Sequence, residues 1–213
     1  MSATAEQIEI LKGLGTATIH EAQGQRGALD AGLRPLDPSR RLGGRAITVD
    51  CRPSDNLALH YALTKARPGD VLVVDAKGFV EAGPWGDILT LAAQQVGIVG
   101  LVIDGAVRDA DAIIEMGFPV FSRGLSIKGT NKFQPGQVNV PVVLGGQIIQ
   151  PGAIVIGDRD GLVIVEADEV AEVIRASQAR EAKEHAIRAA ILRGESTVSL
   201  LDLHDTLRKF GMH

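Results

Sequence analysis

Three polar residues in the middle of the chain have types and a spacing that suit chemistry on an anionic ligand: Asp87, Arg108 and Asp109. Arginine holds a carboxylate through two parallel hydrogen bonds, and aspartate oxygens are ligands that hard divalent cations prefer. A plain surface ion pair, with Asp109 capping the helix that follows, would explain the adjacent Arg–Asp pair as well. The pair alone therefore leaves both interpretations open.

A glycine-bounded segment, Gly83-Pro84-Trp85-Gly86-Asp87-Ile88-Leu89, enters a helix that we expect from about residue 85 to 96. The start of a helix leaves backbone N–H groups unpaired at its positive end, which suits a carboxylate or a phosphate. Glycines at helix starts are common, so this segment alone is a weak signal. Together with Arg108 and Asp109, it predicts one site with backbone N–H donors for an anion, a guanidinium group that binds the same anion, and a metal ligand.

The elements that must position these residues alternate along the chain, which predicts a single α/β domain over residues 1–213. Arg108 and Asp109 come just after a buried strand at 100–103, and open α/β sheets bind ligands outside the carboxyl ends of their strands. Further strands are expected at 46–51, 71–74, 119–122, 138–144, 147–149, 153–156 and 162–165.

Helices complete the expected layers. Thr4 is placed to cap a helix over 5–14, and Ser54 to cap a helix that carries Leu57, Leu59, Ala62 and Leu63. The remaining helices are expected at 16–22, 109–116, about 167–193 and 200–210.

Composition excludes several classes of partner. The net charge is −4 and only 3% of the residues are aromatic, so neither a basic surface nor a base-stacking surface for nucleic acid is expected. No apolar run reaches the roughly 18 residues of a membrane span, and the first residues lack a signal-peptide pattern, so we expect a cytoplasmic protein. The single cysteine, Cys51, is expected to be a buried apolar residue.

The spacing of Asp87, twenty intervening residues and then Arg108-Asp109 resembles the D-x20-R-D signature of class II pyruvate aldolases. These enzymes act on 4-hydroxy-4-methyl-2-oxoglutarate and 4-carboxy-4-hydroxy-2-oxoadipate. The resemblance runs from about residue 16 to 195, and the same fold includes the non-enzymatic regulator of ribonuclease E activity. It rests also on residues 55–58, 85–86, 102–109, 119–124 and 151–163.

The resemblance implies a role for each site residue. The backbone amides of Gly86, Asp87, Ile88 and Leu89 would receive the pyruvate carboxylate, and Arg108 would bind the same end of the substrate. Asp109 would ligate Mg²⁺ or Mn²⁺, and Asp87 would contact a water on that metal. The catalytic residues implied are thus Asp87 and Arg108.

The resemblance also implies an α/β/α sandwich similar to phosphohistidine swivelling domains, assembled as a homotrimer or as a hexamer of paired trimers. The C-terminal helices, about 167–210, would lie at the subunit interface. A glutamate of the neighbouring subunit would complete each site, and Glu184 and Glu195 are both candidates. One departure is His20-Glu21-Ala22, where relatives often have Ser-Asp-Ala.

The expected activity is cleavage of a 4-hydroxy-2-oxo acid to pyruvate and a second oxo acid, accompanied by oxaloacetate decarboxylation, in the breakdown of aromatic acids. The alternative is a non-enzymatic protein that binds and inhibits ribonuclease E. Asp87 favours the enzyme, because the ribonuclease regulators resemble a glycine pattern at that position. A phosphoryl-carrying domain would need a reactive histidine on a glycine-rich loop, and the five histidines provide neither that nor metal-ligand spacing.

Overall fold

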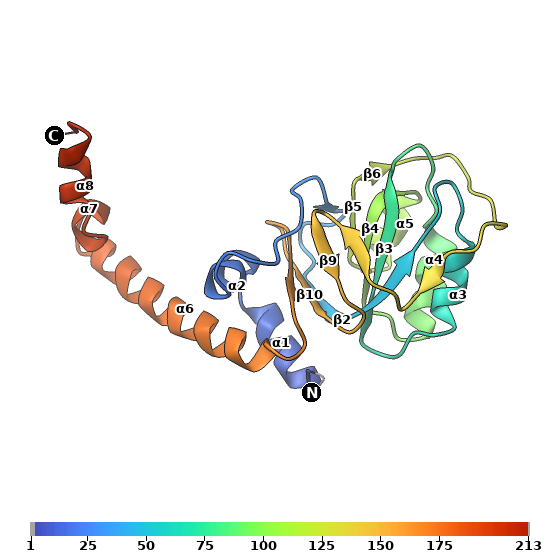
Figure 1. Ribbon diagram of the computed structural model, residues 1–213, viewed down its shortest axis with the longest axis horizontal. Coiled ribbons are helices and arrows are strands. Elements are labelled where there is room, and N and C mark those ends of the chain that lie inside the picture. Colours follow the sequence, from blue (N-terminus) through green and yellow to red (C-terminus); the bar gives the residue numbers. More distant parts are fainter. Residues whose placement is uncertain (1–2, 213) are drawn as a thin grey trace.

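Four parallel strands form the centre of the sheet in the computed structural model, which describes residues 3–212 (Figure 1). They are β2 (Leu42–Asp50), β3 (Asp70–Phe79), β4 (Gly100–Val107) and β5 (Val120–Ser122). The sheet order is β1-β5-β4-β3-β2-β10-β11. Its antiparallel margins are β1 (Arg34–Pro35), β10 (Ile154–Gly157) and β11 (Leu162–Val165), with β6 (Gly124–Leu125) on β4 and β7 (Gln137–Val138) on β2.

The strand expected over 138–144 is wrong as one continuous element. Asn139 has a left-handed backbone (φ 58°), and Pro141 has no N–H to donate to a ladder. The chain therefore leaves the main sheet after β7 and forms a separate antiparallel pair, β8 (Val142–Leu144) and β9 (Gln147–Ile149).

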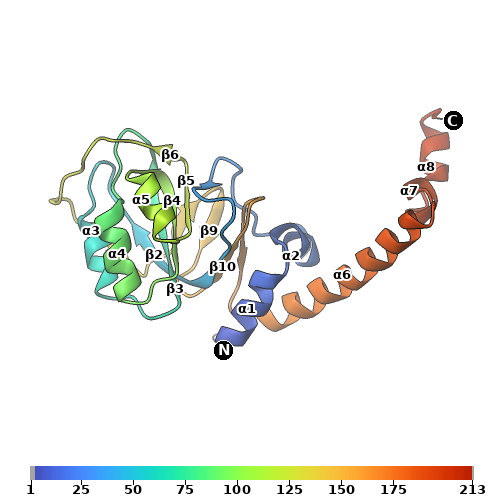
Figure 2. The same cartoon turned by 180° about the vertical axis from the view of Figure 1, so that it is seen from behind.

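Helices pack against the curled sheet in two groups on opposite sides of the molecule, both on the sheet face that lies away from β8 and β9 (Figure 2). One side carries α3 (Leu57–Leu63), α4 (Asp87–Gln95) and α5 (Ala110–Glu115). The other carries α1 (Ala5–Gly13), α2 (Thr16–Ala22) and the start of α6, packed outside β10 and β11.

The run 71–74 in β3 is apolar throughout because it feeds two cores. Leu72 and Val74 pack in the core beneath α3, α4 and α5, whereas Val71 and Val73 pack in the core beneath β8 and β9. Successive side chains of a strand point to opposite faces, so a continuous apolar strand marks a sheet that is covered on both sides.

Local contacts set the helix starts. Thr4 caps α1 as expected, with a capping box to Gln7. The expectation for Ser54 is wrong: Ser54 has a left-handed backbone (φ 58°), α3 begins only at Leu57, and the Asp55 carboxylate accepts the Leu57 N–H at 2.9 Å. Helix α4 begins at Asp87, two residues later than expected.

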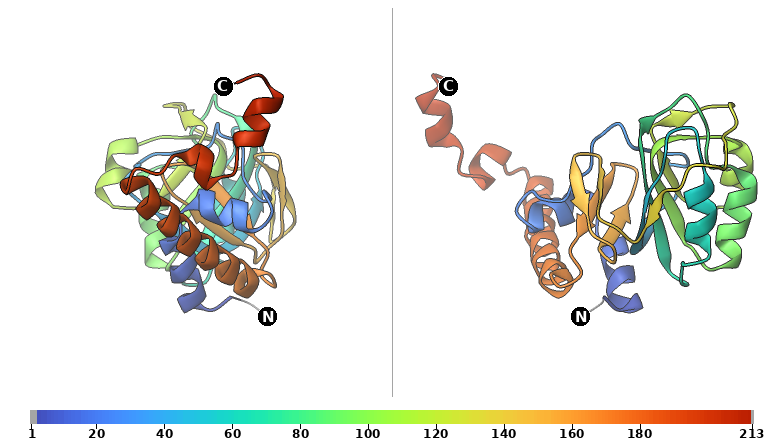
Figure 3. Two further views of the ribbon diagram at one scale, coloured as in Figure 1. Left: turned by 90° about the vertical axis from the view of Figure 1, so that its left-hand side faces the viewer. Right: turned by 45° about the vertical axis from the view of Figure 1, so that its right-hand side comes forward.

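A long C-terminal arm stands away from the body of the molecule (Figures 1 and 3). Helix α6 (Val170–Leu192) buries only four of its 23 residues. The helix expected over 200–210 is instead two short ones, α7 (Thr197–Leu200) and α8 (His204–Lys209), because Asp202 between them is left-handed (φ 53°). The arm exposes Ile191, Leu192, Leu201, Leu203, Phe210 and Met212.

Cys51 is buried, as expected. Burial, with the nearby negative charge of Asp55, raises the pKa of its thiol to about 12. Within residues 3–212, none of the helices combines the length and the apolarity that crossing a lipid bilayer demands.

Candidate active site

The structure brings Asp87, Arg108 and Asp109 together at the N-terminus of α4. Strand β4 ends at Val107, and the Arg108 N–H donates to the Trp85 carbonyl at 2.9 Å, which ties the two segments to each other. The Asp109 Oδ2 atom accepts the Asp87 N–H at 3.3 Å and lies 3.4 Å from Arg108 Nε. The two segments that the sequence marked separately are therefore parts of one surface.

Asp109 does not cap the following helix with its side chain, although it occupies the N-cap position of α5. Its backbone is left-handed (φ 57°, ψ 41°), a conformation that non-glycine residues adopt at a cost and that is concentrated at functional sites. The capping interpretation is therefore wrong, whereas the Arg108–Asp109 ion pair is present. The Asp109 carboxylate is turned toward α4 instead.

Two glycines leave the room that this arrangement needs. A Cβ atom on Gly86 would collide with Asp109 Oδ2 and lie 3.1 Å from Arg108 Cγ. A Cβ atom on Gly83 would lie 2.6 Å from the Ser126 carbonyl oxygen and 3.1 Å from Arg108 Cβ. Both positions must therefore remain without a side chain for Arg108 and Asp109 to approach the start of α4.

The first amides of α4 already attract carboxylate oxygens. The Ile88 N–H donates to the Asp87 side chain at 2.7 Å, and the Asp87 N–H donates to Asp109. The first N–H that returns into the helix is that of Thr90, which donates to the Gly86 carbonyl at 3.0 Å. This helix start therefore donates to carboxylate oxygens of the chain itself, and an anionic ligand would replace oxygens of the same kind.

Arg108 lies between two cavities. The first, about 360 Å³, extends toward the loop after β6 and is lined by Arg108, Asp109, Ala110, Leu125, Ser126 and Ile127. The second, about 180 Å³, extends toward α3 and is lined by Asn56, His60, Gly83, Pro84, Gly86, Asp87, Ile88, Leu89, Arg108 and Lys132. All the predicted substrate-binding residues line the second cavity, which we call the α3–α4 cavity.

The sequence did not point to His60 or Lys132, which line the far end of the α3–α4 cavity. His60 lacks metal-ligand spacing, and Lys132 lies in a loop with no recognisable motif. Burial lowers the pKa of His60, and the charge of Lys132 lowers it further. The imidazole is therefore neutral at neutral pH.

A buried carboxylate fixes the loop that carries Lys132. Asp55 is 2% exposed, and its Oδ2 atom accepts the N–H groups of Phe133 (2.9 Å) and Gln134 (3.1 Å). Burial by itself raises the pKa of Asp55, but these hydrogen bonds and the one from Leu57 outweigh it, so the pKa is lowered. Asp55 thus joins the start of α3 to the loop across the cavity.

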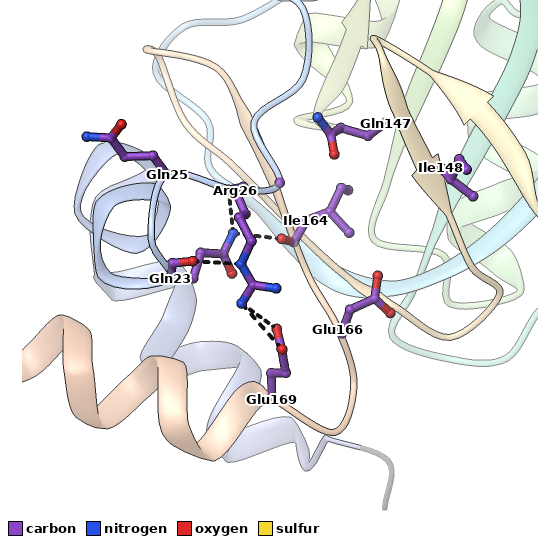
Figure 4. A pocket seen from close by; sticks show the side chains of 9 residues that line it. Gln23, Gln25, Arg26, Gln147, Ile148, Ile164, Glu166 and Glu169 are labelled. Carbon is purple, nitrogen blue, oxygen red and sulfur yellow. Dashed lines mark hydrogen bonds and ion pairs between the residues drawn. The ribbon is translucent and has the colours of Figure 1, made fainter.

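A third cavity, also about 360 Å³, lies between α2, β9, β11 and the start of α6 (Figure 4). Arg26 pairs with Glu169 at 3.2 Å, and Gln23 Nε2 donates to the carbonyls of Arg26 (2.7 Å) and Ile164 (3.0 Å). Burial and two neighbouring carboxylates raise the pKa of Glu166 in its wall. These contacts hold α2 against β11 and α6, and none of the predicted site residues lines this cavity.

The two candidate glutamates of the neighbouring-subunit hypothesis lie on the C-terminal arm. Glu184 pairs with Arg180 (3.0 Å) and Arg188 (2.8 Å), and Glu195 pairs with Arg193 (2.9 Å). Figure 1 shows that the arm points away from α4 of the same chain, so neither glutamate reaches the α3–α4 cavity of its own subunit.

His20 and Glu21, which stand where relatives often have Ser-Asp, also lie at the base of the arm. The His20 ring lies 2.8 Å from the Arg26 carbonyl oxygen, and Glu21 pairs with Arg180 of α6 at 2.5 Å. Neither residue lines the α3–α4 cavity.

The donors at the site are compatible with a hard divalent cation. Asp87 and Asp109 offer carboxylate oxygens, and residues 3–212 hold no group of three or more His, Cys, Asp and Glu side chains that would form a complete cage. Mg²⁺ typically binds one or two carboxylates and fills its remaining positions with water and substrate oxygens. This all-oxygen, incomplete set therefore fits Mg²⁺ or Mn²⁺ better than zinc.

A curled α/β fold and a glycine-bounded helix start beside an Arg–Asp pair define a class of proteins that sequence comparison identifies. Residues 16–164 match the RraA-like family model, described as Aldolase/RraA, and the chain belongs to this family. A protein of Halalkalibacterium halodurans named "Putative 4-hydroxy-4-methyl-2-oxoglutarate aldolase" is 37% identical over 163 residues, covering 76% of this chain and 78% of that protein.

Solved structures show the same fold. An uncharacterized protein from Pseudomonas syringae pv. tomato superposes with a TM-score of 0.82 at 31% identity, covering 94% of this chain and 98% of that one. Streptomyces coelicolor RraAS2, described as an unusual member of the RNase ES inhibitor RraA protein family, has a TM-score of 0.78 at 30% identity. That match covers 88% of this chain and 98% of the Streptomyces chain.

Proposed function

We propose that this protein is a divalent-metal-dependent class II aldolase. It cleaves 4-hydroxy-4-methyl-2-oxoglutarate, or a related 4-hydroxy-2-oxo acid, to pyruvate and a second oxo acid, and it also decarboxylates oxaloacetate. The observation that carries the proposal is the meeting of the first α4 amides, Arg108 and Asp109 at one helix start, where the amides and Arg108 also line the α3–α4 cavity. The name of the Halalkalibacterium relative supports the same substrate class.

The substrate's C1 carboxylate binds at the amides of Asp87, Ile88 and Leu89, where it replaces the side-chain oxygens that occupy two of these amides. Arg108 binds the same end of the substrate and stabilises the negative charge that develops on the C2 oxygen. Asp109, with Asp87 nearby, would hold Mg²⁺ or Mn²⁺, which when bound supplies a Lewis acid for the 2-oxo group.

Bond cleavage then needs a base at the C4 hydroxyl. A water held by Asp87 and by a glutamate of the neighbouring subunit, Glu184 or Glu195, takes the hydroxyl proton. The C3–C4 bond breaks, C4 becomes a carbonyl, and the electron pair passes into the pyruvate enolate, which gains a proton at C3. Oxaloacetate reaches the same enolate by losing carbon dioxide.

No lysine is required as a Schiff base. Lys77 pairs with Asp50 and Asp75, both at 2.6 Å. Burial lowers the pKa of Lys77, but the two carboxylates outweigh this effect and raise it, so Lys77 stays protonated. Lys65 lies over the Tyr61 ring on α3 rather than in the α3–α4 cavity.

The assembly that we propose is a homotrimer or a pair of trimers, in which the arm of one subunit packs on another. The apolar side chains that the arm exposes support a contact with a second copy, because six of them gather within residues 191–212 and exposed apolar patches mark interaction sites. We further propose that the enzyme works in the cytoplasm, in the breakdown of aromatic acids.

The test is pyruvate release by purified protein from oxaloacetate and from 4-hydroxy-4-methyl-2-oxoglutarate with Mg²⁺. We expect EDTA or Arg108→Ala to remove the activity, whereas Arg175→Ala, which breaks an exposed pair on α6, leaves it intact. Activity that survives both EDTA and Arg108→Ala would contradict the mechanism. Absence of release from several 4-hydroxy-2-oxo acids would favour the alternative, inhibition of ribonuclease E, which direct binding to that enzyme would then test.

A further inference from the structure

The third cavity, between α2, β9, β11 and the start of α6, has a carboxylate in its wall that lacks a partner. Glu166 lines this cavity, and its side chain forms no hydrogen bond or ion pair within residues 3–212. Burial and the negative charges of Asp168 and Glu169 raise the pKa of Glu166. A cation beside Glu166 would therefore relieve an unfavourable interaction.

Arg26 does not supply that cation. In Figure 4, the dashed lines from the Arg26 guanidinium end on Glu169, and none reaches Glu166. The Arg26 Nε atom is also engaged, because it donates to the Gln23 backbone carbonyl at 2.8 Å. One arginine and two glutamates line the cavity, so its wall carries a net charge of −1. The charge without compensation is that of Glu166.

A second acceptor in the wall is fixed by the other end of its own amide. Gln23 is 7% exposed, and its Nε2 atom donates to the carbonyls of Arg26 (2.7 Å) and Ile164 (3.0 Å). Both N–H donors of the amide are used, so it cannot turn over without placing its oxygen against two carbonyls. The Oε1 atom therefore stays an acceptor, and no donor within residues 3–212 binds it.

An ammonium group suits this wall better than a metal ion. Residues 3–212 hold no group of three or more His, Cys, Asp and Glu side chains that could bind a metal. A protonated primary amine brings one positive charge and three N–H donors, which match the Glu166 carboxylate and the neutral oxygen of Gln23. Ile148 and Ile164 add apolar surface to the same cavity, which suits a short carbon chain.

We propose that this cavity binds a small primary alkylamine in its protonated form. The ammonium group pairs with Glu166 and donates to Gln23 Oε1, and the carbon chain lies against Ile148 and Ile164. A bound amine thus joins the end of α2 to the end of β11. The volume of about 360 Å³ holds such a ligand, and none of the predicted site residues lines the cavity.

Calorimetric titration of the protein with three ions, at equal ionic strength, separates charge from hydrogen bonding. The n-propylammonium ion has the charge, the N–H donors and the chain; tetramethylammonium has the charge without N–H donors; propionate has a chain and the opposite charge. We expect n-propylammonium to bind at least about tenfold more tightly than either of the others. Equal binding of tetramethylammonium, or no binding of n-propylammonium, would overturn the proposal.

Two variants then locate the site, with melting curves to establish that each is folded. Glu166→Gln removes the charge and keeps the size of the side chain, and Gln23→Met removes the fixed acceptor. We expect each to weaken n-propylammonium binding at least about tenfold. The matched control is Glu172→Gln on α6, an exposed glutamate that pairs with Arg175 at 2.5 Å, and it should leave the affinity unchanged.

Unchanged affinity in Glu166→Gln, or an equal loss in Glu172→Gln, would overturn the assignment of the amine to this cavity. The titration needs no catalysis. Its outcome is therefore independent of whether the protein releases pyruvate.

Discussion

The Asp109 carboxylate accepts a hydrogen bond from the backbone N–H of Asp87 at 3.3 Å, across the gap between β4 and α4. One residue that we expect to hold the metal therefore also occupies an amide that we expect to hold the substrate. The bond is long for an N–H donor, so we expect a substrate carboxylate to displace it at little cost. Under the proposed function, substrate binding would then free the Asp109 oxygen for the cation.

Asp109→Asn tests this coupling. Asparagine keeps an acceptor oxygen and tolerates the left-handed backbone, but it removes the negative charge that a divalent cation needs. We expect Mn²⁺ affinity to fall at least about tenfold and pyruvate release at least about 100-fold, with an unchanged melting temperature. Mn²⁺ titration and melting curves are the measurements, and full activity in this variant would rule out Asp109 as a ligand.

Gly86→Ala is expected to inactivate the enzyme, because its Cβ atom would displace Asp109 and Arg108 from the start of α4. Gly124→Ala is the matched control: a Cβ there meets nothing within 4 Å, so activity and stability should be retained. Comparison of kcat/KM for oxaloacetate in the two variants decides the matter. Equal activities would show that the close approach at Gly86 has no role in catalysis.

Asp55→Asn is expected to loosen the loop that carries Lys132. The variant keeps one acceptor oxygen for the three N–H donors that Asp55 serves, so unfolding should become easier by about 1–3 kcal/mol and KM should rise. Because the folded pKa of Asp55 is lowered, its stabilisation is present above the pKa of the unfolded chain and is lost as pH falls through the folded value.

Denaturant curves from pH 7 down to pH 3 measure this effect. The difference in stability between the protein and Asp55→Asn should shrink toward acid pH. A difference that does not change with pH would show that the Asp55 charge contributes nothing to the loop.

Cys51 gives a prediction for alkaline pH. Its folded pKa of about 12 lies above that of an exposed thiol, so its contribution to stability is complete below the unfolded pKa and is lost as pH rises from there toward about 12. Cys51→Ala should therefore lose stability less steeply above pH 9. A thiol reagent at pH 8 should label Cys51 only after unfolding, and rapid labelling of folded protein would contradict its burial.

The C-terminal arm provides a test of assembly. Phe210→Asp and Leu203→Asp place charges on exposed apolar positions outside the folded body, so the monomer fold should be kept while the proposed trimer weakens. Light scattering on the purified protein measures the mass. An unchanged mass in both variants would mean that these positions lie outside the subunit contact.

Elements with strong local signals were predicted from the sequence alone. The apolar run in β3 and the Thr4 cap of α1 depend on neighbouring residues, and both are present. The start of α4 was misplaced by two residues because Trp85 is held by distant contacts: its carbonyl accepts Arg108 and its ring packs on Phe118. Such tertiary contacts leave no periodic pattern in the sequence.

The two walls of the candidate site also differed in how well the sequence predicted them. Asp87, Arg108 and Asp109 carry a spacing that marks them, and the structure brings them together. Lys132 reaches the cavity because contacts distant in the sequence hold its loop against the start of α3: Asp55 accepts the N–H of Phe133, 78 residues away, and the Asn131 backbone bonds to Ser54 and Asn56. No local pattern in the sequence connects these positions, so the presence of Lys132 in the cavity wall could not be predicted from the sequence.

Gly83 and Gly86 shape the cavity because they have no side chains. The site therefore has two parts that differ in how well they tolerate substitution. On the glycine side every substitution adds atoms where Arg108 and Asp109 already lie, so the residues of that side cannot be replaced without moving Arg108 and Asp109. The Asn56–Lys132 side consists of side chains that can be exchanged singly. We therefore expect changes in what the cavity accepts, in evolution or by design, to fall on that wall.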